Sequence, residues 1–367
     1  MQPVEHPGHK LPVFVWCTGQ DDNIGDVVLR RRLLDELRPF GTLHIFLADA
    51  SVEFVQALSL AIDDVVYEDH ERWKATLNEA ARRGPVLSIG KPGELQIDRI
   101  ALRRALRRLL MHRRVVRNGG LVLQLGIGAR SQPRSWMSLF RLAFRYHQQV
   151  LWRDPQSQAH FGFGAVMPDW GFGDLGPKRP AAPLEATGPR DLVAISMRGD
   201  RPIPGRPWLD GVKAFCQESG LSPVVVTQVR RDGERSRVLA HELGSYLVDW
   251  NDQTHVAQEL RLRDIYARSA LTISDRLHVL IVGFTEGSVP LCMLDRAEHK
   301  VGRHFDAAGY PGASIDVSGQ AAGEIARHLH AAHARAAEVA AARLKVLERI
   351  GEVGRDLRRL VAARLAA

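Results

Sequence analysis

The chain has 367 residues, of which 45% are hydrophobic and 25% charged, a composition typical of a folded globular protein and not of a disordered one. Its length predicts about two domains. Fifty Lys and Arg against 42 Asp and Glu residues give a net charge of +8, which favours anionic partners. The three cysteines are far apart, which excludes a disulfide scaffold and a CxxC zinc site. No apolar stretch reaches the roughly 20 residues of a membrane helix, and the first residues lack the apolar segment of a signal peptide. The sequence therefore predicts a cytoplasmic protein.

The first half of the chain alternates short apolar runs with amphipathic stretches. The apolar runs predict strands at Leu11–Cys17, Leu43–Leu47, Val65–Tyr67, Pro85–Ile89, Gly120–Leu125 and Gln149–Trp152. Helical spacing of apolar residues predicts helices at Asp26–Leu37, Val52–Ile62, Glu71–Arg83, Asp98–Arg117 and Trp136–His147, and a further helix after Asp154. Strands that alternate with helices indicate parallel βαβ units.

The stretch Pro168–Pro189 is rich in proline and glycine, which predicts a linker. Beyond it the alternation of strands and helices restarts, and Gln320–Ala367 predicts helix. The sequence thus predicts an N-terminal α/β domain at 1–167, a linker at 168–190, a C-terminal α/β domain at 191–318 and a helical segment at 319–367. Two doubly wound, Rossmann-like domains that face a cleft describe a glycosyltransferase-B-like arrangement, with the ligand site between the domains.

The segment Leu271–Leu294 carries the most chemical information. A strand leads directly into a helix with Ser274 as its predicted N-cap, so the start of the helix lies at the carboxyl edge of the sheet. The free amides and dipole of a helix start favour an anion. Arg276 supplies donors suited to phosphate or carboxylate, and His278 exchanges protons near neutral pH. The structural alternative is a salt-bridged arginine and a hydrogen-bonded core histidine.

Ser274–His278 (SDRLH), followed by an apolar run, Gly287–Pro290 and Lys300, resembles the C-terminal signature of the polysaccharide pyruvyl transferase family. Three other segments are similar to family motifs and occur in the same order: Asn23–Asp26, Arg153-Asp154 with Ser157, and Ile195–Arg198. The resemblance covers about residues 12 to 310. One departure is that the family's glycine-rich turn ending in an acid corresponds here to Ser88–Glu94, which contains Lys91 and Pro92.

This resemblance implies transfer of pyruvate from phosphoenolpyruvate onto two hydroxyls of one sugar, which makes a cyclic ketal and releases phosphate. The acceptor would be a cell-surface polysaccharide or glycolipid precursor, and neither a metal nor another cofactor is implied. The resemblance implies that His278 is the general acid/base. It implies donor contacts at Arg198, Ser274, Arg276, Leu277 and Lys300, and acceptor contacts at Asn23, Gly25, Asp26, Glu94 and Asp98.

Other functions fit parts of the sequence. A nucleotide-sugar-dependent glycosyltransferase of the same architecture would need a glutamate for the donor ribose, and none stands near Ser274. The helix at Ala101–Arg117 holds seven arginines and no acid, but the chain lacks any known nucleic-acid-binding module, so no nucleic-acid partner is expected. A basic amphipathic helix could rest on an anionic membrane at the cytoplasmic face, which suits a lipid-linked acceptor. The alternative is an ordinary solvated helix face.

Overall fold

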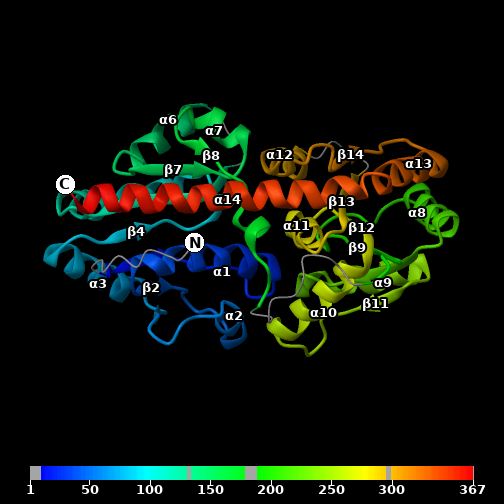
Figure 1. The fold of residues 1–367 in the computed structure, drawn as a ribbon, viewed down its shortest axis with the longest axis horizontal. Helices are drawn as coiled ribbons and strands as arrows, with labels where there is room; N and C mark the ends of the chain where they lie inside the picture. The colour runs from blue at the N-terminus through cyan, green and yellow to red at the C-terminus, as the bar shows by residue number, and fades with distance from the viewer. Residues whose placement is uncertain (1–9, 130–133, 178–187, 295–298, 367) are drawn as a thin grey trace.

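The computed structural model describes residues 10–129, 134–177, 188–294 and 299–366, which form two α/β lobes that lie end to end (Figure 1). The described strands of the N-terminal lobe form one parallel sheet in the order β3-β2-β1-β4-β6-β7-β8, and β5 pairs with β6. Their bounds are β1 Val13–Trp16, β2 Leu43–Phe46, β3 Val65–Tyr67, β4 Leu87–Ile89, β5 Gly93–Leu95, β6 Leu121–Ala129, β7 Gln149–Trp152 and β8 Ala165–Val166.

The helices of this lobe are α1 Ile24–Leu37, α2 Val52–Ala57, α3 His70–Arg83, α4 Arg99–Arg107, α5 Leu109–Arg117, α6 Arg134–Ala143 and α7 Pro155–Phe161. The order of the predicted strands and helices in this half is confirmed, but two short strands, β5 and β8, were not predicted, and α6 ends at Ala143 instead of His147. The second helix ends at Ala57, and the helix predicted at Asp98–Arg117 is two helices that meet at Arg108. The Arg108 guanidinium lies over the Trp16 ring, 4.9 Å from its centroid.

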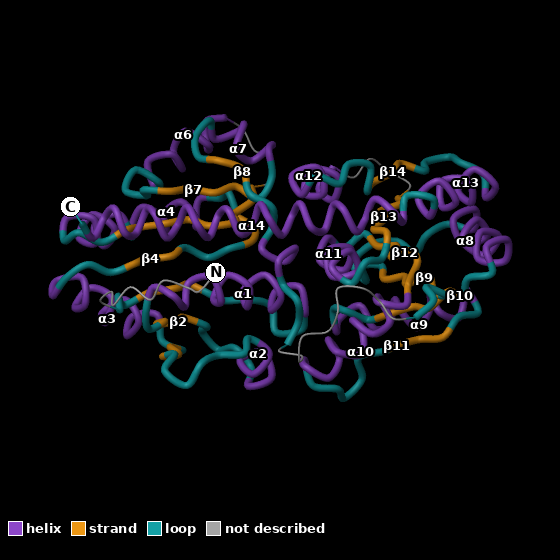
Figure 2. Tube along the Cα trace, viewed as in Figure 1, coloured by secondary structure: helices purple, strands orange, loops and turns teal. Residues whose placement is uncertain are grey.

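The C-terminal lobe has a second parallel sheet, in the order β11-β10-β9-β12-β13-β14 among the described residues (Figure 2). The strands are β9 Leu192–Ser196, β10 Ser222–Val226, β11 Tyr246–Val248, β12 Ser269–Ser274, β13 Val289–Leu294 and β14 Ser314–Asp316. The helices are α8 Arg206–Ser219, α9 Gly233–Leu243, α10 His255–Arg268, α11 Leu277–Thr285, α12 His299–Ala308, α13 Ala322–His333 and α14 Ala336–Leu365. The predicted fold class, two doubly wound α/β domains, is confirmed.

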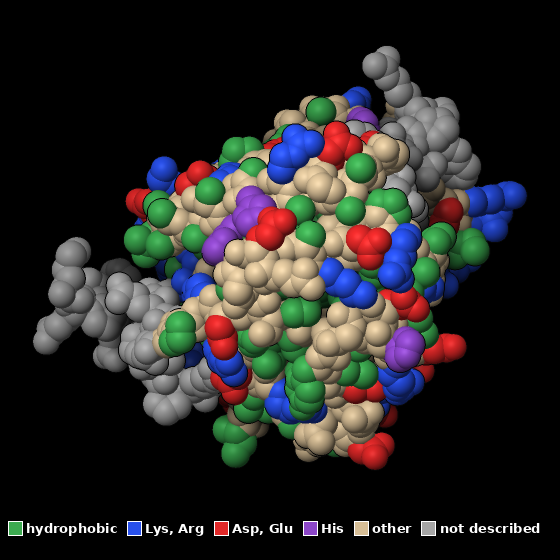
Figure 3. Space-filling view, turned by 90° about the vertical axis from the view of Figure 1, so that its right-hand side faces the viewer, with side chains coloured by type: hydrophobic (Ala, Val, Ile, Leu, Met, Phe, Trp, Pro, Cys, Tyr) green, Lys and Arg blue, Asp and Glu red, His purple; other side chains and the backbone are tan. Residues whose placement is uncertain are grey.

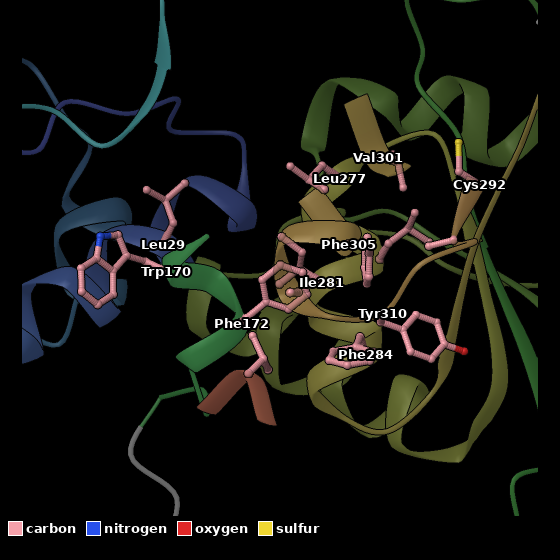
Figure 4. Close-up of a cluster of buried hydrophobic side chains, with 14 of the residues drawn as sticks. Leu29, Trp170, Phe172, Leu277, Ile281, Phe284, Cys292, Val301, Phe305 and Tyr310 are labelled. Carbon is pink, nitrogen blue, oxygen red and sulfur yellow. The ribbon is translucent and has the colours of Figure 1, made fainter. Parts of the chain in front are cut away.

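Part of the predicted linker is packed in the core between the lobes. Residues 178–187 lie outside the described part of the chain, but Trp170–Gly173 forms a short 3₁₀ helix, η2, whose residues are all buried. Figure 4 shows Trp170 beside Leu29 of α1, and Phe172 beside Ile281 of α11. Phe172 also packs edge-on against Phe284 and Phe305, with ring centroids 5.7 and 5.2 Å apart. The burial of Trp170 and Phe172 thus holds this part of the predicted linker in a fixed, packed conformation despite the surrounding prolines and glycines.

The C-terminal helix α14 crosses both lobes along the long axis of the molecule (Figure 1). It has 30 residues, which corresponds to about 45 Å at 1.5 Å per residue. Near its end, Arg364 donates hydrogen bonds to the carbonyl oxygens of Val116 and Gly119 in the N-terminal lobe. The predicted helical segment is therefore confirmed as helical, and it fastens the two lobes together.

A cluster of buried charges also joins the lobes. Arg31 of α1 donates two hydrogen bonds each to Asp174, which follows η2, and to Glu259 of α10, at 2.6 to 3.0 Å. Arg263 of α10 pairs with the same two carboxylates at 2.9 and 2.6 Å. All four side chains are at most 3% exposed. We refer to these four residues as the interlobe ion cluster.

Candidate functional site

A cavity of about 340 Å³, here called the cleft cavity, lies between the lobes where the carboxyl ends of both sheets face each other. It receives residues from β5 and the loop before it, from the start of α1, from the loop after β9 and from the start of α11. Among the predicted site residues, those that line it are Asn23, Asp26, Glu94, Arg198, Arg276, Leu277, His278 and Lys300. Segments far apart in the sequence thus meet at one place, as expected for a cleft site.

The start of α1 approaches His278 from the opposite lobe. Asn23 is the N-cap of α1, and its side chain accepts a hydrogen bond from the Gly25 amide at 3.0 Å. A Cβ atom placed on Gly25 would lie 2.4 Å from the Cβ of His278. Only glycine permits this approach, because any side chain would displace the histidine. Gly25 therefore lets the start of α1 pack directly against His278.

Asp26 faces the cleft cavity and is held from two sides. Its carboxylate accepts a hydrogen bond from the Gln20 amide at 2.7 Å and lies 3.1 Å from Arg30. Burial acts to raise the pKa of Asp26, but Arg30, the Gln20 amide and His278 outweigh it and hold the pKa below its usual range. Asp26 is therefore an anion at neutral pH, able to accept hydrogen bonds from sugar hydroxyls.

The helix at the SDRLH segment begins two residues later than predicted. Helix α11 starts at Leu277 with Arg276 in extended geometry at the N-cap, and no side chain caps it. Ser274 is not the cap: its hydroxyl donates to the Ser196 carbonyl and accepts from the Arg276 amide at 3.0 Å. Ser274 is 1% exposed and does not line the cavity, so it shapes the turn instead of facing a ligand. The uncapped amides of α11 point their partial positive charge toward the cleft.

Arg276 and Arg198 both line the cleft, and each is paired with a carboxylate of its own lobe. The Arg276 guanidinium donates two hydrogen bonds to the Asp232 carboxylate, at 2.5 and 2.6 Å, and the Arg276 side chain is 11% exposed. Arg198 forms the same two-point contact with Asp200, at 2.8 and 2.5 Å, but Asp200 is 62% exposed. The Arg198–Asp200 pair can therefore open to solvent more readily than the buried Arg276–Asp232 pair.

His278 is 16% exposed, and its Nε2 atom is buried without a hydrogen-bond partner. The nearest acid is Asp169, with an oxygen 3.6 Å from Nε2. Asp169 in turn accepts a hydrogen bond from Arg153 at 2.9 Å and another from the Gly171 amide. Burial acts to raise the pKa of Asp169, but His278 and Arg153 outweigh it and hold the pKa far below its usual range. An ionised carboxylate therefore lies beside the imidazole ring that is the candidate general acid/base.

Lys300 of α12 and Glu94 of β5 form an ion pair of 3.1 Å between the lobes at the edge of the cleft. Asp98, the other predicted acceptor-side acid, does not reach the cleft. It is the exposed N-cap of α4, where its side chain accepts from the Ala101 amide at 2.7 Å. A capping aspartate and a ligand-binding aspartate have the same sequence signal, so the sequence could not separate the two roles.

Three residues that were not predicted as site residues also belong here. Arg153 lines the cavity and was seen only as part of a motif. Asp169 follows Pro168 in the glycine-rich stretch that predicted a linker, which hid its role. Asp232 lies before α9, with no sequence signal that it pairs with Arg276 across 44 residues.

The cleft is markedly basic. Among the described residues that line it, Lys and Arg number eight, against three Asp and Glu: Arg30, Lys91, Arg153, Arg198, Arg201, Arg231, Arg276 and Lys300, against Asp26, Glu94 and Asp275. By contrast, Figure 3 shows acidic and basic side chains interspersed over the outer end of the C-terminal lobe. Seven of these eight cations are ion-paired, four of them with carboxylates outside the lining, so an anionic ligand has to share or displace those carboxylates.

No protein-family model and no curated protein matches this sequence. Solved structures do match. A glycosyltransferase from Rickettsia africae shares 13% identity over 98% of this chain and 99% of its own, with a TM-score of 0.58. The chain has the glycosyltransferase-B fold. A UDP-GlcNAc 2-epimerase from Neisseria meningitidis, bound to UDP-GlcNAc, shares 9% identity over 96% of this chain and all of its own, with a TM-score of 0.52.

Two further points hold for the part of the chain that the structure describes. No helix there is long and apolar enough to cross a bilayer. No group of three or more His, Cys, Asp or Glu side chains there is placed to hold a metal ion.

Proposed function

We propose that the cleft binds phosphoenolpyruvate and transfers its pyruvyl group to two hydroxyls of a sugar. The observation that carries this proposal is the convergence of His278, Arg276 and Arg198 on one basic cavity at the uncapped start of α11. Phosphoenolpyruvate bears a phosphate and a carboxylate on three carbons. Two arginines and a helix start supply separate binding groups for two anions.

The residues have distinct roles in the proposed reaction. Protonated His278 gives its proton to the methylene carbon, while one sugar hydroxyl attacks the neighbouring carbon and loses its own proton. The bond from that carbon to the phosphate oxygen then breaks, phosphate leaves with the proton lost by the first hydroxyl, and the second hydroxyl attacks and returns a proton to His278. Asn23 and Asp26 orient the hydroxyls from the other lobe. Asp169 is a positioning residue, because it acts through His278.

A second candidate is a nucleotide-sugar-dependent glycosyltransferase, and the fold comparisons favour it over pyruvyl transfer. A neighbouring cavity of about 340 Å³ in the C-terminal lobe is lined by Ile203, Trp208 and Met293. Arg198 and Arg201 line both this cavity and the cleft cavity. A nucleobase would fit the apolar walls, and a diphosphate would meet the arginines. Against it, no glutamate of the C-terminal lobe lines either cavity in the described part of the chain.

Titration calorimetry with phosphoenolpyruvate and with UDP separates the two candidates. Pyruvyl transfer predicts binding of phosphoenolpyruvate, and phosphate release once a suitable sugar acceptor is added. Arg276→Gln removes a charge-assisted contact worth about 1.5–3 kcal/mol, so its affinity should fall roughly 10-fold to 150-fold. Arg327→Gln is the matched control, because Arg327 is 76% exposed on α13. Tight binding of UDP without binding of phosphoenolpyruvate would select the glycosyltransferase instead.

A further inference from the structure

The N-terminal lobe contains a second cavity, of about 310 Å³, which we call the side cavity. It lies between the sheet and helices α3 to α6, and adjoins the cleft cavity: Lys91, Glu94 and Gln96 line both. Its volume lies within the range of small-molecule sites, at roughly 300–1,000 Å³. Nothing in the reaction proposed above uses it.

Most of the side cavity's wall is apolar. Trp16 from β1 and Trp73 from α3 lie against one side, with ring centroids 6.3 Å apart. Met111 of α5 packs in the same hydrophobic cluster as Trp73, whereas Phe140 of α6 belongs to a different cluster; both line the cavity and are at most 5% exposed. Such walls bind a hydrocarbon or aromatic group by removing it from water.

The polar part of the wall holds three cations, Lys91, Arg104 and Arg108, and one acid, Glu94, among the described residues. Arg108 stacks on Trp16, and burial together with the nearby Arg104 lowers its pKa to about 10. Among the residues that the structure describes, no carboxylate forms an ion pair with Arg108, and the Glu94 carboxylate of the same wall is paired with Lys300 at 3.1 Å. His112 is 8% exposed, and its Nδ1 atom has no hydrogen-bond partner. Burial, His147 and Arg108 hold the pKa of His112 well below its usual value, so the ring is neutral and can donate or accept a hydrogen bond.

We propose that the side cavity binds an apolar group that carries a phosphate, with the phosphate on Arg104 and Arg108 and the hydrocarbon between Trp16 and Phe140. The charge pattern favours this ligand: Arg108 is half-buried and Arg104 exposed, so their guanidinium groups are open to an anion, and the apolar part of the wall favours a hydrocarbon. Both arginines belong to the helix predicted to rest on a membrane, so part of its charge faces an internal site.

The position of the side cavity deepens the proposed function, on which this last step rests. A sugar in the cleft cavity, joined through phosphate to an apolar chain, would extend past Lys91 and Gln96 into the side cavity. The acceptor class is therefore a sugar on a lipid phosphate.

Calorimetry without any donor tests the site. Geranyl phosphate should bind, whereas geraniol and inorganic phosphate should each bind at least tenfold more weakly, because each lacks one half of the ligand. Arg108→Gln should weaken geranyl phosphate binding at least tenfold. Arg113→Gln, the same change at an exposed position of the same helical region that does not line the cavity, should have no effect. Arg108→Lys, which keeps the charge, should retain more affinity than Arg108→Gln, and circular dichroism should show that all variants are folded.

Equal binding of geraniol and geranyl phosphate would overturn the anion site, and tighter binding of UMP than of geranyl phosphate would overturn the lipid. Equal losses of geranyl phosphate affinity in Arg108→Gln and Arg113→Gln would overturn the placement of the phosphate beside Arg108. Geranyl phosphate binding in a protein that does not bind phosphoenolpyruvate would leave the side cavity assigned while the proposed reaction fails. Binding of phosphoenolpyruvate without binding of geranyl phosphate would overturn the ligand proposed for the side cavity and leave the proposed reaction standing.

Discussion

Replacing Arg31 by methionine removes one of the two arginines in the interlobe ion cluster. Arg31 makes four hydrogen bonds to Asp174 and Glu259, and a fifth to the Ala57 carbonyl at 2.9 Å. Both carboxylates stay buried after the substitution, with Arg263 as their remaining partner within the cluster. Removing one partner of a buried ion pair costs about 3–5 kcal/mol.

Differential scanning calorimetry measures this loss. For domains of about 150–250 residues, 1 kcal/mol shifts the melting temperature by about 2–4 °C, so Arg31→Met should melt about 10 °C lower. Arg82→Met, an exposed arginine on α3, is the control and should change the melting temperature by less than 2 °C. Adding Glu259→Gln to Arg31→Met should recover part of the loss, because it removes a buried charge. A single variant that melts within 2 °C of the wild type would refute the argument.

The stability that the interlobe ion cluster contributes should depend on pH, because its Glu259 carboxylate is buried beside two arginines. Burial acts to raise the pKa of Glu259, and Arg31 with Arg263 outweighs it, so the pKa lies below its usual range in the folded protein. A lowered folded pKa gives stability that is complete above the unfolded value, about 4.3, and is lost as the pH falls toward the folded value. The difference in melting temperature between wild type and Arg31→Met should therefore narrow below about pH 4.

Three further predictions concern the cleft. His278→Gln should lower turnover of the donor about 10²–10⁴-fold while binding persists, and stopped-flow phosphate release would check it; unchanged turnover would make His278 a core residue. Gly25→Ala should lower turnover by displacing His278, with the melting temperature as a control for general unfolding, and full activity would contradict the close contact. Asp200→Asn should release Arg198 and tighten donor binding a few-fold in calorimetry, whereas weaker binding would show that Asp200 helps to hold the donor.

The strands and most helices could be predicted because apolar periodicity is a local signal. Boundaries were less certain where side chains bond across the fold. Ser274 looks like an N-cap, but its hydroxyl is used by the Ser196 carbonyl, so α11 starts at Leu277. The division at Arg108 was not predicted either, because Arg108 keeps right-handed helical backbone angles and no proline or glycine stands there.

For the candidate site too, local signals could be read from the sequence and contacts across the fold could not. The strand-to-helix order predicted that Arg276 and His278 lie at the carboxyl edge of a parallel sheet, and the resemblance to pyruvyl transferases implied that Arg198 joins them. The sequence could not show that Arg276 is already held by Asp232, since that contact joins two different loops. Nor could it show the side cavity, which is formed by residues from a strand and several helices that meet only in the folded lobe.

The path of α14 has a consequence for how the protein is made. The N-terminal lobe is synthesised first, yet Arg364 makes its hydrogen bond to Gly119 across 245 residues of sequence. On the ribosome, the lobe must therefore wait with part of its surface uncovered while the entire C-terminal lobe is translated. Such delayed contacts slow folding and leave apolar surface open to wrong partners. Helix α14 covers part of the N-terminal lobe only after the whole chain is made. A chain whose synthesis stops before α14 would leave that surface open to chaperones and proteases.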